Sequence, residues 1–153
     1  SIQVGARNMQ NVALHKELGK TNKPILLKRG LSSTIEEWIM AAEYIMAGGN
    51  NEVILCERGG VTHFDHVRWD LSISIIAMVK QITHIPIIID ASHGTGNRNL
   101  VKPLTLAGIA AGADGCLIEC HCNPDESMSD AEQAITPKLF CSIIDDAKKI
   151  KEL

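Results

Sequence analysis

Short apolar runs alternate regularly with longer amphipathic segments along the 153 residues of this chain. Each apolar run has the length of a strand, and each amphipathic segment repeats its apolar residues every three or four positions, as a helix does. The predicted strands are 2–4, 25–27, 53–56, 85–89 and 115–119, and the predicted helices are 8–18, 35–46, 71–81, 100–111 and a last one that begins near Pro137. This alternation predicts a parallel sheet whose strands are joined by right-handed helical crossovers.

Five such β/α units place the chain in the α/β class and fit two architectures. One is an open doubly wound sheet, and the other is five of the eight units of a TIM barrel, which normally needs about 250 residues. The length is typical of one domain, so we expect residues 1–153 to form a single domain. The chain starts with Ser1-Ile2-Gln3, without Met or a polar leader. We therefore expect it to be the C-terminal part of a longer protein or to begin at a cut site.

Two of the predicted helices carry sharper local signals. Thr34 with Glu37 three residues later has the pattern of a capping box, which predicts a helix start. In the first predicted helix, Met9, Val12, Ala13 and Leu18 are spaced so that they can share a buried side.

Composition and charge exclude several classes of protein. A formal net charge of −3 gives no broad attraction to nucleic acid or acidic membranes. No apolar run has the length of a transmembrane helix, and the start lacks the pattern of a secretory signal. Cysteines without framework spacing are typical of free thiols in a reducing compartment, so we expect a cytoplasmic protein. These residues are Cys56, Cys116, Cys120, Cys122 and Cys141.

Cations stand at the ends of the first three predicted strands. They are Arg7, Lys28 and Arg58. Parallel strands place their carboxyl ends at one edge of a sheet, so these side chains are expected to converge. Converging Arg and Lys donors suit a phosphate or a carboxylate. A single cation of this kind is usually a solvated loop residue, but three in successive units predict an anion-binding clamp.

The stretch Ile85–Gly96 reads as a strand that presents Asp90 and His93 and then bends into a loop. Glu119 ends the next predicted strand, and Asp130 follows in a polar loop. A His and carboxylates at one strand edge predict a mixed nitrogen and oxygen site for a divalent metal. Taken singly, His93 fits a hydrogen-bonded loop residue and Asp130 fits a helix cap, so the prediction depends on the set.

Other motifs carry weaker signals. Cys120-His121-Cys122 has no second ligand pair at zinc-finger spacing, which disfavours structural zinc. Gly94 and Gly96 do not complete a dinucleotide-binding fingerprint. Trp38 and Trp69 are interpreted as packing residues.

Five motifs in order carry a family resemblance. They are Gln-Val-Gly-Ala-Arg-Asn-Met-Gln-Asn at 3–11, Lys-Pro-Ile-Leu-Leu-Lys-Arg-Gly at 23–30, Val-Ile-Leu-Cys-Glu-Arg-Gly at 53–59, Asp-Ala-Ser-His-Gly at 90–94 and Met-Ser-Asp-Ala-Glu-Gln at 128–133. Together they resemble the 3-deoxy-D-arabino-heptulosonate 7-phosphate (DAHP) synthases, in the short microbial branch related to the 3-deoxy-octulosonate 8-phosphate synthases. The resemblance covers essentially the whole chain.

The resemblance implies a metal-dependent transferase with a TIM-barrel fold, of which this chain would hold the C-terminal five β/α units as an incomplete barrel. The implied reaction condenses phosphoenolpyruvate with erythrose 4-phosphate and releases phosphate, as the first step of the shikimate pathway of aromatic amino acid biosynthesis. A divalent metal ion, Mn, Fe, Zn or Co, is the implied cofactor and would polarise the aldehyde. A homo-oligomer is expected.

Carried over by position, the resemblance also implies roles for individual residues. Lys28 and His93 are the implied catalytic residues. The implied metal ligands are His93, Glu119 and Asp130. The implied substrate-binding residues are Ala6 through its backbone, Arg7, Lys28, Arg58 and Arg98.

The sequence departs from the family pattern at several places. It lacks the Gly-Pro-Cys motif that supplies a fourth metal ligand and the Lys-Pro-Arg-Thr loop that helps to bind both substrates. Cys56 belongs to a different motif and does not replace that ligand. Asn97-Arg98-Asn99 stands where Arg-Arg-Asp is more usual, and Cys122 stands where Pro usually follows the His.

Two alternatives stay open on the sequence alone. One is a related synthase that uses another sugar phosphate. The other is a non-catalytic partial-barrel module that associates through its open edge strands.

Overall fold

The five predicted strands form one parallel sheet in the computed structural model, which describes residues 1–63 and 65–152. The strands are β1 (Ile2–Val4), β2 (Ile25–Lys28), β3 (Val53–Glu57), β4 (Ile87–Asp90) and β5 (Gly115–Leu117). Their order across the sheet is their order along the chain. A doubly wound sheet reverses its order at a switch point, whereas a barrel wall does not, so the described sheet has the topology of a partial TIM barrel.

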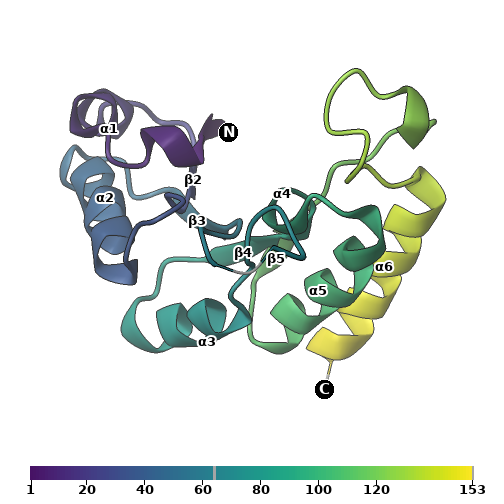
Figure 1. The fold of residues 1–153 in the computed structure, drawn as a ribbon. Helices are drawn as coiled ribbons and strands as arrows, with labels where there is room; N and C mark the ends of the chain where they lie inside the picture. The colour runs from purple at the N-terminus through teal and green to yellow at the C-terminus, as the bar shows by residue number, and fades with distance from the viewer. Residues whose placement is uncertain (64, 153) are drawn as a thin grey trace.

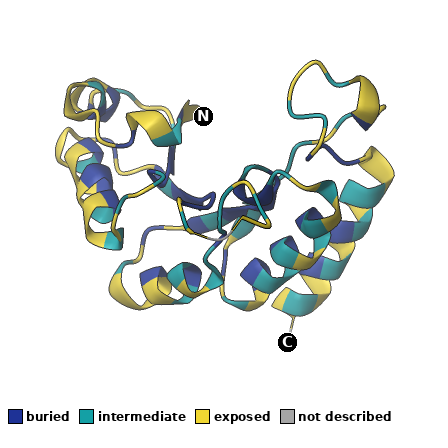
Figure 2. Cartoon of the chain, viewed as in Figure 1, coloured by how far each residue is buried: buried dark blue, intermediate teal, exposed yellow. Residues whose placement is uncertain are grey.

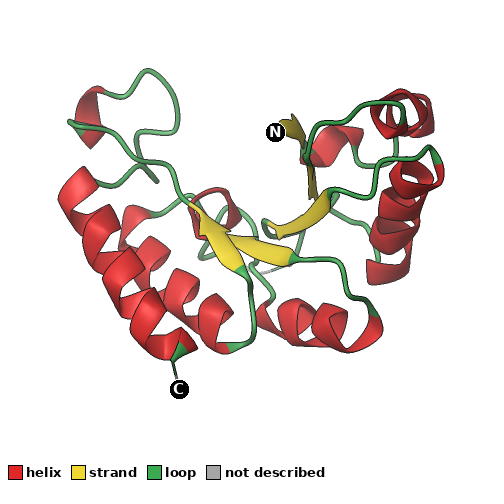
Figure 3. Cartoon of the chain, turned by 180° about the vertical axis from the view of Figure 1, so that it is seen from behind, coloured by secondary structure: helices red, strands yellow, loops and turns green. Residues whose placement is uncertain are grey.

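Each strand is followed by one or more helices, which connect β1 to β5 in turn and end with α6 after β5. They are α1 (Val12–Gly19), α2 (Ile35–Ala47), α3 (Ile73–Ile82), α4 (Ala91–Thr95), α5 (Arg98–Ala110) and α6 (Pro137–Lys151), with short 3₁₀ turns at Ala6–Asn8 and Pro124–Glu126. Figure 1 shows α1, α2, α3, α5 and α6 in an arc along one side of the curved sheet, and Figure 3 shows the same arc from behind. No helix in residues 1–63 and 65–152 is both long and apolar enough to cross a bilayer.

The core lies between this arc and the sheet, and it is aliphatic. Leu27, Leu55 and Ile87 are fully buried on the helix side, and the central strands β2, β3 and β4 are mostly buried (Figure 2). The alternate residues Ile54 and Ile88 point to the other face and are only half-buried. In a complete barrel that second face forms the packed interior.

The predicted capping box begins α2 as expected. The Glu37 backbone N–H donates to Thr34 Oγ1 at 3.1 Å, and the Thr34 N–H donates to the Glu37 carboxylate at 2.9 Å. The prediction for the first helix was wrong at its start. A 3₁₀ turn over Ala6–Asn8 precedes α1, whose N-cap is Asn11, so Val12 and Ala13 are exposed rather than buried.

The loop predicted after Asp90 is in fact the short helix α4. Asp90 caps it, because Asp90 Oδ1 accepts the backbone N–H of His93 at 3.0 Å. Gly96 ends it in the left-handed region, with a φ of 68° that favours glycine. The helix was missed because its Ser, His and Gly residues have turn-like preferences. It places His93 one turn beyond the strand end.

Candidate active site

Residues from the carboxyl ends of β1 to β4 line one cleft of about 480 Å³. The predicted residues Ala6, Arg7, Lys28, Arg58 and His93 all line it, and so does Asp130 from the loop after β5. The sequence argument that parallel strands would bring these side chains together is therefore confirmed by the geometry of the sheet.

A buried carboxylate contacts both a cation of this cleft, Lys28, and the predicted metal ligand His93. Asp90, which has no exposed surface, accepts a hydrogen bond from Lys28 Nζ at 2.8 Å through Oδ2. His93 Nδ1 lies 2.8 Å from the same Oδ2. Burial acts to raise the pKa of Asp90, but the hydrogen bond from His93 and the charge of Lys28 outweigh it and leave this pKa below its ordinary value. The carboxylate therefore stays ionised and holds both side chains.

This contact fixes the orientation of the His93 ring. An ionised carboxylate only accepts hydrogen bonds, so Nδ1 is the ring nitrogen that donates to Asp90, and Nε2 is the ring nitrogen that faces Glu119 and Asp130. His93 Nε2 lies 3.2 Å from Glu119 Oε1 and 3.7 Å from Asp130 Oδ2. Ligands about 2.1 Å from a tetrahedral ion stand roughly 3.4 Å apart, so these three atoms fit a shared divalent ion.

Within residues 1–63 and 65–152, these three residues are the one group of His, Cys, Asp and Glu side chains with ligand atoms close enough to hold a metal ion. The Glu119 backbone N–H donates to the buried Ser92 Oγ at 3.0 Å, which ties Glu119 to α4. The predicted strand through Glu119 is shorter than expected and stops at Leu117, so Glu119 lies in the following loop and is partly exposed.

Asp130 is the one described residue other than glycine with a positive φ, at 53°. This left-handed conformation costs an aspartate on the order of 1 kcal/mol, and it is held by the loop around it. The backbone N–H groups of Gln133 and Ala134 both donate to the Asp130 carbonyl, at 3.1 and 3.0 Å. Strained backbone that is held in this way is common where a side chain must be aimed at a ligand.

Two predicted site residues are not among the described residues that line the cleft. Glu119 contacts His93 in the metal cluster, whereas Arg98 lies in neither the cleft lining nor that cluster. The Arg98 guanidinium pairs with Asp125 at 2.8 Å and donates to the carbonyl of Ala131. Both partners belong to the loop that carries Asp130. Arg98 therefore secures that loop, and it is absent from the described residues that line the cleft.

Among the described residues, Arg58 is the most buried cation of the cleft that forms no ion pair with a carboxylate. It is 9% exposed, and its Nη1 has no hydrogen-bond partner in the described structure. Burial lowers the pKa of its guanidinium. A buried guanidinium with an unpartnered N–H group can donate that hydrogen bond to an anion bound in the cleft.

Sequence reasoning missed several residues that line the cleft, and among them Arg68 and Trp69 contribute a charge and an aromatic ring. Trp69 was interpreted as a packing residue, and Arg68 was given no role. The signal that identifies them is position, since both lie in the loop after β3, as Arg58 does.

Comparison with known proteins identifies the family to which this chain is similar. The family model of the DAHP synthetase I family matches residues 1–153. The phospho-2-dehydro-3-deoxyheptonate aldolase of Thermotoga maritima is 44% identical over 99% of this chain and 45% of its own length. The 2-dehydro-3-deoxyphosphooctonate aldolase of Desulfotalea psychrophila is 29% identical over 88% of this chain and 51% of its own length. The chain thus spans about half the length of these curated relatives.

Solved structures extend the match to three dimensions. The crystal structure of the Thermotoga maritima enzyme superposes with a TM-score of 0.95 over 99% of this chain and 44% of that one. A truncated form of 3-deoxy-D-arabino-heptulosonate 7-phosphate synthase from the same organism also gives 0.95, and the match covers 58% of its length. Both are 44% identical in sequence. On the evidence of sequence, fold and site together, the chain belongs to the DAHP synthetase I family.

Proposed function

We propose that this chain supplies the cationic and metal-binding side of an enzyme that condenses phosphoenolpyruvate with erythrose 4-phosphate. In this reaction C3 of phosphoenolpyruvate bonds to the aldehyde carbon, water adds at C2, and phosphate departs to leave DAHP, the first product of the shikimate pathway. The observation that carries the proposal is that a cationic cleft and a His–Glu–Asp cluster share one strand edge. The names of the Thermotoga relatives support the same reaction.

The cations of the cleft are the proposed binding groups for phosphoenolpyruvate, which carries a phosphate and a carboxylate. Arg7 and Arg58 offer planar donor pairs that match either anion. The backbone of Ala6 lies at the same mouth, in the turn after β1. Lys28 Nζ gives one hydrogen bond to Asp90 and keeps two donors for the substrate.

The metal proposal depends on His93, Glu119 and Asp130. A nitrogen with two carboxylates suits several divalent transition metals, so Mn, Fe, Zn and Co all fit the donor set. An ion bound there supplies a Lewis acid for the aldehyde oxygen. Asp90 supports both parts of the site, because one carboxylate orients the imidazole of His93 and anchors the ammonium of Lys28.

The proposal is tested by following phosphate release from phosphoenolpyruvate in the presence of erythrose 4-phosphate. We expect activity to disappear with EDTA and to return when a divalent metal is added. His93→Ala should abolish activity and metal binding together, while Lys16→Ala, on the exposed side of α1, should change neither. Full activity after complete removal of metal would refute the metal assignment.

A second candidate is a synthase for another sugar phosphate, and the similarity to 2-dehydro-3-deoxyphosphooctonate aldolases favours it over unrelated enzymes. A panel of aldehyde phosphates, including erythrose 4-phosphate and arabinose 5-phosphate, separates the two. A protein that binds neither metal nor phosphoenolpyruvate would instead be a non-catalytic module. The single domain over 1–153, the homo-oligomer and the cytoplasmic location stay predictions.

A further inference from the structure

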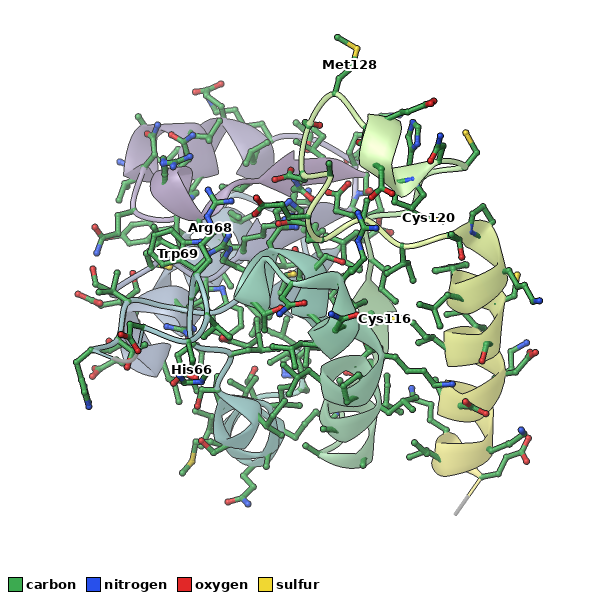
Figure 4. The ribbon with its side chains drawn as sticks, turned by 45° about the vertical axis from the view of Figure 1, so that its right-hand side comes forward. His66, Arg68, Trp69, Cys116, Cys120 and Met128 are labelled. Atoms are coloured by element: carbon green, nitrogen blue, oxygen red, sulfur yellow. The ribbon has the colours of Figure 1, made fainter. Side chains whose placement is uncertain are left out.

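The loop between β3 and α3 brings a second arginine and a tryptophan to the cleft. Figure 4 shows the labelled Arg68 and Trp69 side by side on this loop. The guanidinium carbon of Arg58 lies 5.6 Å from the centroid of the Trp69 ring, and that of Arg68 lies 5.9 Å from it. Both are within cation–π range, so one indole holds two guanidinium groups.

The loop is fixed to the part of the fold that carries His93. Gly60 and Asp70 form a bridge in which each backbone N–H donates to the other carbonyl at 3.0 Å. The Arg68 N–H donates to the carbonyl of Thr95, the last residue of α4, at 3.1 Å. A Cβ on Gly59 would lie 3.0 Å from the Trp69 Cβ, which shows how closely the chain packs there. Arg68 and Trp69 therefore keep a defined position relative to the cleft.

The positive charges in the cleft are only partly compensated. Lys28 is paired with Asp90. In the described part of the chain, no ion pair is formed by Arg7 or Arg68, and Nη1 of the buried Arg58 has no partner. The charge of Arg68 also acts to lower the pKa of Arg58, as expected for two cations held close together. An anion of more than one charge bound between them would relieve this repulsion.

We propose that Arg68 is an additional anion-binding residue of the cleft and that Trp69 is a positioning residue that holds Arg58 and Arg68 around one phosphate monoester dianion. The indole ring stabilises both guanidinium groups when the cleft is empty, and the phosphate oxygens accept from both of them when it is filled. The inference rests on the proposed function, because both proposed substrates are phosphate monoesters.

The test measures equilibrium binding of phosphoenolpyruvate, erythrose 4-phosphate and inorganic phosphate separately, at one ionic strength and with metal content recorded. Arg68→Ala should weaken binding of the phosphate ligand about tenfold or more, as the loss of charge-assisted hydrogen bonds does. Trp69→Ala should weaken it roughly two- to fivefold, and Trp69→Phe should recover part of that loss. Whichever substrate is affected identifies the phosphate that the pair binds.

The coupling between the affinity losses of the Arg68 and Trp69 variants distinguishes a positioning role of Trp69 from a general structural effect. If Trp69 acts through Arg68, the double variant should lose less affinity than the product of the two single losses. Arg68→Lys, which keeps the charge without the planar fork, should bind between the parent and Arg68→Ala. Lys16→Ala and Tyr44→Ala remove an exposed cation and an exposed aromatic on the outer helices, and they should leave affinity unchanged.

Two results would overturn the inference or its part for Trp69, and a third would overturn the proposed function instead. If Arg68→Ala and Trp69→Ala bind all three ligands like the parent while Arg58→Ala does not, Arg68 and Trp69 have no such role and the proposed function stands. If the affinity loss of the double variant equals the product of the two single losses, Trp69 does not act through Arg68. If inorganic phosphate binding depends on Arg68 and Trp69 but neither substrate binds, the anion site is real and the proposed function is wrong.

Discussion

The substitution Asp90→Asn tests the buried link between the two halves of the site. It keeps the size of the side chain and an oxygen that can cap α4. It removes the charge that Lys28 Nζ and His93 Nδ1 each contact at 2.8 Å. The side chains of Lys28 and Asp90 are 6% and 0% exposed, so water cannot replace the lost partner. Breaking a buried pair in this way costs about 3–5 kcal/mol, and we expect the free energy of unfolding to fall by that amount.

A second substitution tests whether the unpaired ammonium of Lys28 causes the loss of stability. Lys28→Met in the Asp90→Asn background removes the uncompensated ammonium, and we expect it to return the stability to within about 1 kcal/mol of the parent. Metal affinity should fall about 10- to 100-fold in both variants, because His93 loses the carboxylate that orients it. Urea unfolding in EDTA measures the free energy of unfolding, and metal titration measures the metal affinity. A loss below about 1 kcal/mol for Asp90→Asn, or no recovery in the double variant, would refute the buried-pair account.

Three further predictions concern single residues. Asp130→Ala should be less stable than Asp130→Gly by about 1 kcal/mol in metal-free urea unfolding, because glycine adopts the φ of 53° without the strain that alanine has there; equal stabilities would contradict the strain. Thr34→Ala should lower the free energy of unfolding by about 1 kcal/mol through the lost cap of α2, and Thr34→Ser should not. Burial lowers the pKa of His15, and a weaker contact with the Asn8 backbone opposes this shift, so stability should fall as pH drops below the unfolded pKa of about 6.5. His15→Leu should remove that part of the pH dependence of the urea midpoint, and an unchanged slope would contradict it.

The strand ends were predictable because they depend on periodicity and on a topological rule. Once 2–4, 25–27 and 53–56 are parallel strands, Arg7, Lys28 and Arg58 must come to one edge of the sheet. The same rule brought His93 and Glu119 together, because both were read at strand ends. Asp130 was added from the polar loop that follows Glu119, and the family resemblance implied the same three ligands.

The contacts that the sequence could not reveal depend on how distant loops fold. Arg98 stands where the family usually has Arg-Arg-Asp, so the resemblance implied a substrate role for it. Its actual partner, Asp125, lies in a loop whose path no local pattern specifies. Trp69 was treated as a packing residue because an isolated aromatic in a loop gives no periodic signal. Its contacts with two arginines arise only when the loop closes at Gly60 and Asp70.

The agreement between strand order and chain order has a consequence for how the molecule folds. In the described sheet, each strand pairs only with strands that are its immediate neighbours in sequence, as Ile25 does with Ile2 and with Val53. Long loop closures, which slow the folding of many sheets, are therefore not needed for any of these pairings. Each β/α unit can dock on the one synthesised before it, so the sheet can grow during translation without waiting for the last strand.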